Sequence, residues 1–317
     1  MSRRRLPAWL AIGGAVLVGV MTAVQARING SLGVALGDGF VAAVISFGSG
    51  LAILIVLCAV LPEGRAGIVR LAKGVGSSIP TWVLLGGLAG ALTVATQGLT
   101  VATIGVALFT VGVVAGQTVN GLVLDRVGYG PAGVVAVTMG RVAGAGLVLV
   151  AVVLCVTGEG VSGVPWWMLL LPFLAGAGIA WQQATNGRLR QAVGSPLVAT
   201  FVNFIGGTIA LTVAAVIHVA LVGAPASAPT DLWLYTGGAI GVVYIFLSAA
   251  LVRHTGVLLL GLGSVVGLLA TSVVLDAVWP PIAGPSLPLA LAAVFVALTG
   301  VVTAVVPWSR LRRRTRG

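Results

Sequence analysis

Two stretches of this chain carry the same arrangement of residues: GVMTAVQARINGSLGVALGDGFVAAVISFGSG at 19–50 and GAGIAWQQATNGRLRQAVGSPLVATFVNFIGG at 176–207, an offset of 157 positions. Each contains a Gln followed four residues later by Asn-Gly, and each ends in Phe-x-x-Gly. Glycine is abundant in the chain, so matched glycines alone carry little weight. The rarer Gln and Asn-Gly matches at one constant offset therefore predict an internal repeat.

The repeat continues beyond these stretches at a second offset. A shift of 151 positions places Trp82-x-x-x-Gly86-Gly87 on Trp233-x-x-x-Gly237-Gly238, and Asp125 on Asp276. The difference of six residues between the two offsets falls in the loops. The sequence therefore divides into a first repeat at 1–157, a linker at 158–165, a second repeat at 166–309 and a basic tail at 310–317.

The composition excludes a soluble globular protein. Charged residues make up 7% of the 317-residue chain and apolar residues 59%, whereas a soluble domain carries roughly 25% charged residues. The net charge of +11 comes mainly from terminal Arg clusters and short breaks between apolar runs, and no basic face of a soluble domain, as nucleic-acid binding requires, can be found. Lipid is the expected solvent, and no nucleic acid is expected as a partner.

The apolar runs predict ten transmembrane helices, because a helix needs about 20 residues to cross the hydrocarbon core. The class is an all-α integral membrane protein; β-barrel strands would alternate instead. The run 80–124 is about twice the length of one crossing and is divided at Thr103-Ile104-Gly105. The predicted spans are 7–27, 39–61, 80–101, 105–124, 137–157, 165–186, 196–222, 232–252, 256–277 and 286–308.

The distribution of charge predicts the topology. With ten spans and both termini in the cytoplasm, 15 of the 17 basic residues lie on the cytoplasmic side, the 62–79 connection included, and Arg27 opposes the rule. The linker then lies outside. Each repeat holds five spans, an odd number, so the second repeat enters the bilayer from the opposite side. Two inverted five-helix repeats are therefore expected.

Several motifs resemble one branch of a known superfamily. These are Gln25-x-x-x-Asn29, Trp82-x-x-x-Gly86-Gly87, Gly116-Gln117 and Asp125-Arg126-x-Gly128. The chain resembles two fused five-helix units of the bacterial YdcZ-like branch of the drug/metabolite transporter superfamily, over roughly 8–308. The resemblance implies transport and leaves the substrate open. The second half departs from the pattern at Leu268, Ala277 and Trp279, where the first half has Gln117, Arg126 and Gly128.

Amide side chains form the first candidate site. Gln25 and Asn29 lie four residues apart on one helical face, as do Gln182 and Asn186, with Trp181 beside the second pair. An amide in lipid needs a partner, so these faces are expected to point into the bundle or a wet cavity. Two roles are open for these amides. They contact the substrate, or they satisfy backbone groups at helix ends, because Asn-Gly often terminates a helix.

A polar stripe and two glycine motifs supply the other candidates. Thr93, Thr96, Gln97 and Thr100 follow one face of the third span; the repeat aligns Tyr244 and Ser248 with Thr93 and Gln97. The stripe lines a solute path, or its threonines bond their own helix. Gly112 and Gly116 precede Gln117 and Asn120, and Gly263 and Gly267 repeat the spacing; these glycines are expected to pack helices closely. The pathway candidates are Gln25, Asn29, Thr93, Gln97, Gln117, Asn120, Trp181, Gln182, Asn186, Tyr244 and Ser248.

The titratable residues predict no catalysis. Asp125 and Asp276 each close a span, where they bind water, an Arg or exposed helix donors, or couple transport to a cation. His218 stands without a ligand cluster and is expected to be packed or interfacial. Paired acids, metal-ligand spacing and a phosphate-binding loop are all missing from the sequence, which predicts no enzyme, no metal and no cofactor.

The function expected from this pattern is a secondary transporter or facilitator in the cytoplasmic (inner) membrane. It moves a small polar or amphiphilic metabolite or drug by alternating access between halves that enclose a polar hollow. Two alternatives stay open: a flippase of a lipid-linked carrier, for which Arg27 and Arg141 are the available headgroup ligands, and a non-transporting scaffold. The expected partners are membrane lipid and a small-molecule substrate, and a homodimer is left open.

Overall fold

The computed structural model describes residues 8–130, 133–134, 136–157, 161–225 and 227–305, without the side chains of 8, 11, 248–250, 252–262 and 305. The predicted basic tail, 310–317, and the first part of the linker, 158–160, lie outside this part of the chain. The named elements of the described residues are helices: α1 (Ala8–Leu36), α2 (Gly39–Val60), α3 (Pro62–Gly74), η1 (Thr81–Leu85), α4 (Gly86–Val127), α5 (Met139–Val156), α6 (Trp166–Val193), α7 (Pro196–Val222), η3 (Leu232–Tyr235), α8 (Gly237–Val278) and α9 (Leu287–Val305).

Helix starts follow local capping chemistry. Asp38 precedes α2, and its carboxylate accepts hydrogen bonds from the Phe40 and Val41 backbone amides. Ser195 precedes α7, and its hydroxyl accepts from the Val198 amide. Such side chains satisfy amides that have no partner in the first helical turn. Asp38 and Ser195 are related by the offset of 157, so the repeat extends to the caps.

The two Asn-Gly pairs lie inside helices, which corrects the alternative that placed them at helix ends. Helix α1 continues past Asn29-Gly30 to Leu36, and α6 continues past Asn186-Gly187 to Val193. Tertiary packing explains the glycine in the first pair: a Cβ at Gly30 would lie 2.8 Å from the Cβ of Val101. Gly30 therefore allows α1 and α4 to approach closely. This packing outweighs the tendency of Asn-Gly to terminate a helix.

Helix α4 consists of two helices that run in opposite directions. Gly105 interrupts it with φ 84° and ψ 161°, a conformation that glycine adopts without a steric penalty. A Cβ at Gly90 would lie 2.6 Å from Nε2 of Gln182, and Gln117 bonds the adjacent Gln183. A straight helix would separate Gly90 and Gln117 by about 40 Å. The division predicted at residues 103–105 is confirmed.

Helix α8 also reverses along α1. A Cβ at Gly241 would lie 2.6 Å from Nε2 of Gln25, and one at Gly267 would lie 2.0 Å from the Val16 carbonyl oxygen. Those glycines would be about 39 Å apart in a straight helix, whereas their two partners span about 14 Å of α1. Both ends of α8 therefore lie beside one helix.

Helix α3 was not expected, because residues 62–79 were predicted only as a cytoplasmic connection. Its buried face is made of glycines: a Cβ at Gly64 would meet the Cys58 backbone at 2.6 Å, and one at Gly67 would meet Val198 at 2.6 Å. The exposed residues of α3 include Arg65, Arg70 and Lys73. A short helix with a basic outer face is typical of an element that lies along a membrane surface.

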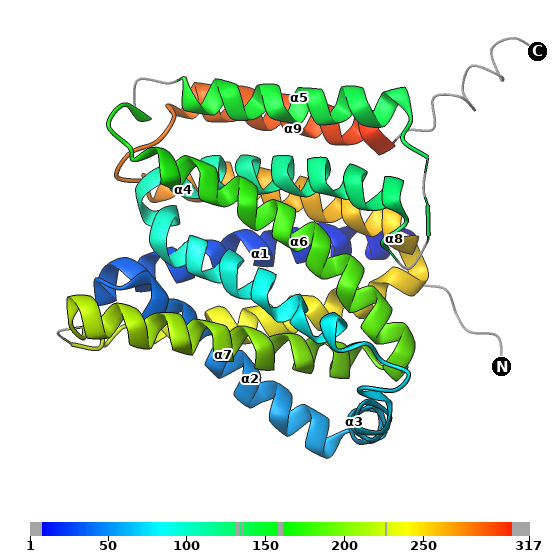
Figure 1. Ribbon diagram of the computed structural model, residues 1–317. Helices are drawn as coiled ribbons and strands as arrows, with labels where there is room; N and C mark the ends of the chain where they lie inside the picture. The colour runs from blue at the N-terminus through cyan, green and yellow to red at the C-terminus, as the bar shows by residue number, and fades with distance from the viewer. Residues whose placement is uncertain (1–7, 131–132, 135, 158–160, 226, 306–317) are drawn as a thin grey trace, which may run out of the picture.

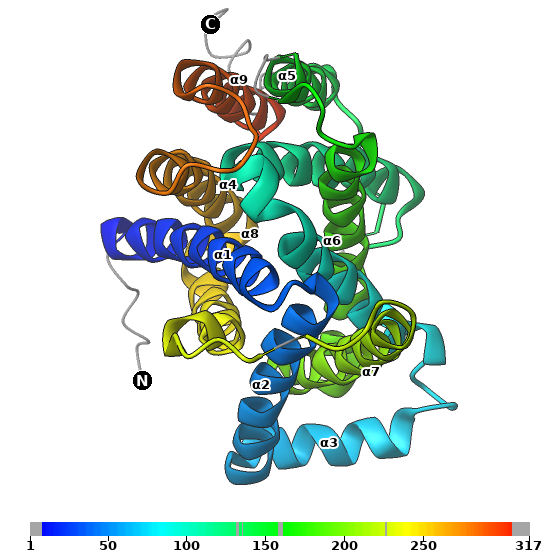
Figure 2. The ribbon, with the colours of Figure 1, turned by 90° about the vertical axis from the view of Figure 1, so that its left-hand side faces the viewer.

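The two repeats are interleaved. Helix α1 packs on α8, α4 on α6, α2 on α7 and α5 on α9, as Figure 1 shows. Seen along the helices, α5 and α9 lie at one edge, α2, α7 and α3 at the other, and α1, α4, α6 and α8 between them (Figure 2). Each pair joins one helix from each half, so the hydrophobic core is shared.

Contacts between the halves are reciprocal. A Cβ at Gly19 would lie 1.9 Å from the carbonyl oxygen of Ser264, and one at Gly176 would lie 2.0 Å from that of Val113, which is the same contact after the two offsets. Helices α2 and α7 are antiparallel, because Asp38 before α2 bonds His218 near the end of α7. The start of α2 therefore lies beside the end of α7.

By length and composition, six helical segments among the described residues can cross a membrane. One of them, Thr81–Val127, includes the reversal at Gly105 and is long enough for two crossings. The protein is thus a multi-pass membrane protein whose described elements are helices.

Candidate functional site

The first amide cluster lies between α1, α4 and α8 and is closed. Gln25 Nε2 donates to the Gly237 carbonyl oxygen at 2.8 Å, and Asn29 Nδ2 donates to Gln97 Oε1 at 2.6 Å. The exposed fractions of Gln25, Asn29 and Gln97 are 5%, 0% and 3%. Three of the predicted residues thus meet in one place, away from solvent.

The second amide cluster lies between α6 and α7 and is partly open. Gln182 Nε2 donates to Asn203 Oδ1 at 2.9 Å, and Asn186 Nδ2 approaches the same oxygen at 3.4 Å. Gln182 and Asn186 are partly exposed. Asn203 was missed by the sequence analysis, although the offset of 157 places it on another polar residue, Ser46.

The Gly-Gly motifs make room for both clusters. A Cβ at Gly237 would lie 2.3 Å from Asn29 Oδ1, and one at Gly86 would lie 2.6 Å from Asn186 Oδ1. Side chains at these positions would push the amides out of place. The Trp-x-x-x-Gly-Gly motif of each half is therefore a backbone surface against which the amides of the other half pack.

Two phenylalanines separate the clusters. Phe47 and Phe204, which the offset of 157 relates, stack with ring centroids 4.7 Å apart and planes at 27°. Phe47 borders Gly90 beside Gln182, and Phe204 borders Gly241 beside Gln25. Each ring therefore lies beside one of the two amide clusters, and the expectation of one polar hollow shared by the halves stays a prediction.

The polar stripe of the third span divides into two kinds of residue. The hydroxyls of Thr93, Thr96 and Thr100 donate to carbonyls of their own helix, at 2.7 to 2.9 Å. Only Gln97 reaches another helix among these four residues, which favours helix back-bonding for the threonines. Tyr244 is partly buried, and the side chain of Ser248 lies outside the described residues.

The seam between α4 and α6 is polar and accessible. Gln117 Nε2 donates to Gln183 Oε1 at 3.1 Å, and Asn120 Nδ2 donates to the Ala177 carbonyl oxygen at 2.7 Å. Trp181 is partly exposed near this seam. The corresponding seam of the other half has Leu268 and Thr271 in place of Gln117 and Asn120, so it is more apolar.

The four glycines predicted to pack helices lie at close contacts. A Cβ would lie 2.8 Å from Pro172 at Gly112, 1.8 Å from the Phe173 carbonyl oxygen at Gly116, 2.6 Å from Ala15 at Gly263 and 2.0 Å from the Val16 carbonyl oxygen at Gly267. Backbone therefore meets backbone at Gly116 and Gly267, and a small side chain packs against Gly112 and Gly263.

The acids make structural contacts. Both carboxylate oxygens of Asp276 accept hydrogen bonds at 2.7 Å, from the Val106 and Ala107 amides. These are the free donors that start the second part of α4, after the break at Gly105. Arg27 interacts electrostatically with Asp276. Asp125 instead pairs with Arg141, so each acid has the kind of partner expected for a helix end.

His218 is not isolated. Its Nδ1 lies 3.0 Å from Asp38 Oδ2, and its ring lies 5.3 Å from that of Phe40. The pair joins the start of α2 to the end of α7. Among the described residues, no group of three or more His, Cys, Asp or Glu side chains could hold a metal ion.

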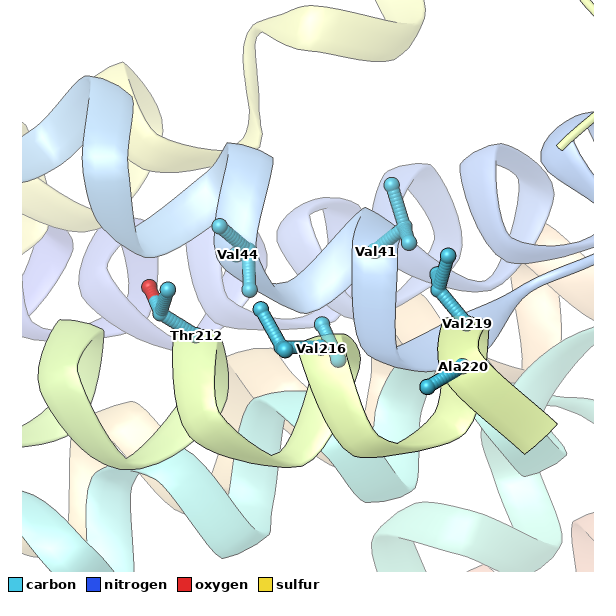
Figure 3. Close-up of a pocket in the computed structure, with 7 residues that line it drawn as sticks. Val41, Val44, Thr212, Val216, Val219 and Ala220 are labelled. Carbon is cyan, nitrogen blue, oxygen red and sulfur yellow. The ribbon is translucent and has the colours of Figure 1, made fainter. Parts of the chain in front are cut away.

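An apolar groove of about 480 Å³ lies between α2 and α7, away from the amides. Figure 3 shows its lining side chains, of which Thr212 is the one with a hydroxyl. The lining residues are Val41, Val44, Thr212, Ala215, Val216, Val219 and Ala220. Since it offers almost no hydrogen-bonding groups, this groove cannot replace the predicted polar path.

The fold and its paired amide clusters define a multi-pass helical membrane protein built from two related halves. The model of one family, described as "Putative inner membrane exporter, YdcZ", matches the chain twice, over residues 10–154 and 160–305. The chain therefore belongs to the YdcZ family of the drug/metabolite transporter superfamily and contains two fused units. This is a membrane-exporter family and not an enzyme family.

One solved structure, named only "Crystal structure of protein", is similar over 99% of this chain and 100% of its own, with 20% identity and a TM-score of 0.52. At that identity the likeness shows the fold alone. No curated protein matches the chain.

Proposed function

We propose that this protein is a secondary exporter that moves a small polar or amphiphilic molecule across the cytoplasmic membrane by alternating access between two inverted five-helix repeats. One observation carries the proposal: the two related amide clusters differ in exposure, Asn29 being 0% exposed while Asn186 is partly exposed. A protein that only scaffolds has no reason to keep one cluster closed and the other open.

Ten crossings follow if α4 and α8 each count twice, beside α1, α2, α5, α6, α7 and α9. The antiparallel pairing of α2 with α7 supports inversion, because related helices then point in opposite directions across the bilayer. Helix α1 begins and α9 ends at the same end of the bundle as α3, as Figure 1 shows. The basic face of α3 supports a cytoplasmic location for that end of the bundle, and with it for both termini.

In this orientation the structure is inward-facing. Helix α1 starts in the cytoplasm, so Gln25 and Asn29 lie in its outer half, whereas Gln182 and Asn186 lie in the inner half of α6. The inner cluster is the partly exposed one. Because contacts between the repeats are reciprocal, exchanging the two conformations of the halves would open the outer cluster and close the inner one.

The geometry does not favour a lipid-carrier flippase. Of its two available headgroup ligands, Arg141 is already paired with Asp125. A headgroup phosphate would have to displace this carboxylate. The small-solute exporter needs no such exchange.

Transport by purified protein tests the proposal. Benzoate, ethidium and alanine serve as anionic, cationic and zwitterionic probes in proteoliposomes. We expect at least one flux above that of empty liposomes, and Gln182→Leu should lower it about tenfold, the cost of one lost substrate hydrogen bond of about 1.4 kcal/mol. Gln191→Leu is the matched control, since Gln191 is exposed further along α6. No flux for any probe, or equal flux in Gln182→Leu, would contradict transport through this cluster.

Cysteine labelling tests the inward-facing state. In inside-out vesicles, a membrane-impermeant maleimide should label Asn186→Cys and leave Asn29→Cys unlabelled. The reason is that Asn186 is partly exposed, whereas Asn29 is 0% exposed. The native Cys58 and Cys155 are buried and give little background. The two variants are related by the repeat, so each controls for the other. Equal labelling of both would rule out the proposed asymmetry.

A further inference from the structure

An arginine on α6, near the second amide cluster, lies against two aromatic rings. The guanidinium carbon of Arg188 is 5.5 Å from the ring centroid of Trp82 and 4.9 Å from that of Tyr129. The two rings are 5.5 Å apart and tilted by 43°. The Tyr129 hydroxyl is fixed by Thr185 Oγ1 at 3.1 Å. These residues were not among the candidates drawn from the sequence.

Arg188 has spare hydrogen-bonding capacity. Within the part of the chain that the structure describes, its side chain makes one hydrogen bond, from Nη2 to the Gly128 carbonyl oxygen at the long distance of 3.4 Å. The ion pairs among those residues join Arg141 to Asp125 and His218 to Asp38, and neither includes Arg188. A guanidinium carries five N–H donors, so most of this fork is available to a ligand.

The site lies near the second amide cluster and is present in one half only. Trp82 precedes Gly86 by four residues, and a Cβ at Gly86 would lie 2.6 Å from Asn186 Oδ1. Arg188 follows Gln182 by six residues, about 9 Å along the axis of α6. The offsets place Ser31 at the position of Arg188 and Pro280 at that of Tyr129 in the other repeat. An exporter gains from this asymmetry, because the loading end captures its solute and no equivalent arginine retains it at the release end.

We propose that Arg188, Trp82 and Tyr129 form the loading site for a small organic anion. Its carboxylate binds the guanidinium fork, which matches the geometry of two carboxylate oxygens, while the aromatic faces hold the guanidinium by cation–π contact. The remainder of the solute reaches Gln182 and Asn186. This inference rests on the proposed export function and adds the chemical class of the substrate.

Thermal melting of the detergent-purified full chain tests binding independently of transport. Benzoate is the probe, with benzamide and benzylammonium as its uncharged and cationic counterparts. We expect benzoate to raise the melting temperature in a concentration-dependent manner, with no rise from the other two. Arg188→Gln should weaken the apparent affinity at least about tenfold, and Arg188→Lys, which keeps the charge and loses the fork, should fall between. Arg190→Gln is the control, as it removes the same charge from an exposed position on α6.

Each result is decisive. The melting temperature of each variant without ligand reports whether that variant folds. If Arg188→Gln does not fold, Arg188→Lys still allows benzoate binding to be compared with that of the original protein. No benzoate response, equal responses to benzylammonium, or a response that both Arg188 variants retain would overturn the anion site. If Gln182-dependent flux persists in that case, export stands and only the substrate class is wrong. If no probe is transported while benzoate binding depends on Arg188, the binding site stands and the export function fails.

Discussion

Gly19→Ala is expected to prevent close packing of α1 on α8 and to lower the stability of the fold more than most single substitutions. The new Cβ would lie 1.9 Å from the Ser264 carbonyl oxygen and 2.5 Å from the Leu268 amide nitrogen. Both atoms belong to a helix backbone, so neither can rotate away. We expect a loss of about 3 kcal/mol, at the upper end for overpacking, measured as a lower melting temperature in detergent.

The chain offers a matched control on the same helix. A Cβ at Gly13 has no atom within 4 Å, so Gly13→Ala should leave the melting temperature unchanged or raise it, because alanine favours a helix more than glycine does. The related contact predicts the same contrast in the other half, where a Cβ at Gly176 meets the Val113 carbonyl oxygen at 2.0 Å. If Gly19→Ala and Gly13→Ala melted alike, α1 would not approach α8 as described.

Asp276→Ala is expected to destabilise the reversal in α4. The carboxylate satisfies two backbone amides, of Val106 and Ala107, and interacts with Arg27. Its removal leaves two backbone donors without a partner inside the bundle, at a cost of about 3 kcal/mol. Asp276→Asn should lie between, since one amide oxygen can still accept. Thermal unfolding of the purified variants measures both effects.

Asp125, which the offset of 151 relates to Asp276, is the matched control for this substitution. It pairs with Arg141 where both side chains are about 30% exposed, at 31% and 27%, and partly exposed ion pairs contribute about 0–1 kcal/mol. Asp125→Ala should therefore lower the melting temperature far less than Asp276→Ala. Equal losses would mean that capping of the second part of α4 does not depend on Asp276.

Much of the fold could be predicted because it depends on properties that run along the chain. The low charge and long apolar runs require lipid, and the two offsets require two related halves. The break at Gly105 was predicted from the length of one apolar run, since 45 residues from Pro80 to Leu124 exceed a single crossing. The same reasoning missed α3, whose polar residues and three glycines resemble a loop until neighbouring helices cover the glycine face.

The candidate site was predicted in part. Gln25, Asn29, Gln182 and Asn186 could be selected because an amide in an apolar span must find a partner. Their hydrogen-bond partners could not be predicted, because Gln25 bonds the carbonyl oxygen of Gly237, 212 positions away. Asn203 and the Phe47–Phe204 stack belong to α2 and α7, and only the crossing of these helices brings them beside the amides.

The residue order thus determined by itself that this is a repeated, helical membrane protein of the YdcZ family whose halves carry buried amides. Only the tertiary structure decided which amides are closed, that Asp38 meets His218, and that Arg188 lies beside Trp82 and Tyr129. The reason is that composition, spacing and offset are local properties of a sequence. Exposure and partnership depend instead on how helices distant in the chain cross, and both halves follow the same pattern of contacts while differing in the side chains that fill it.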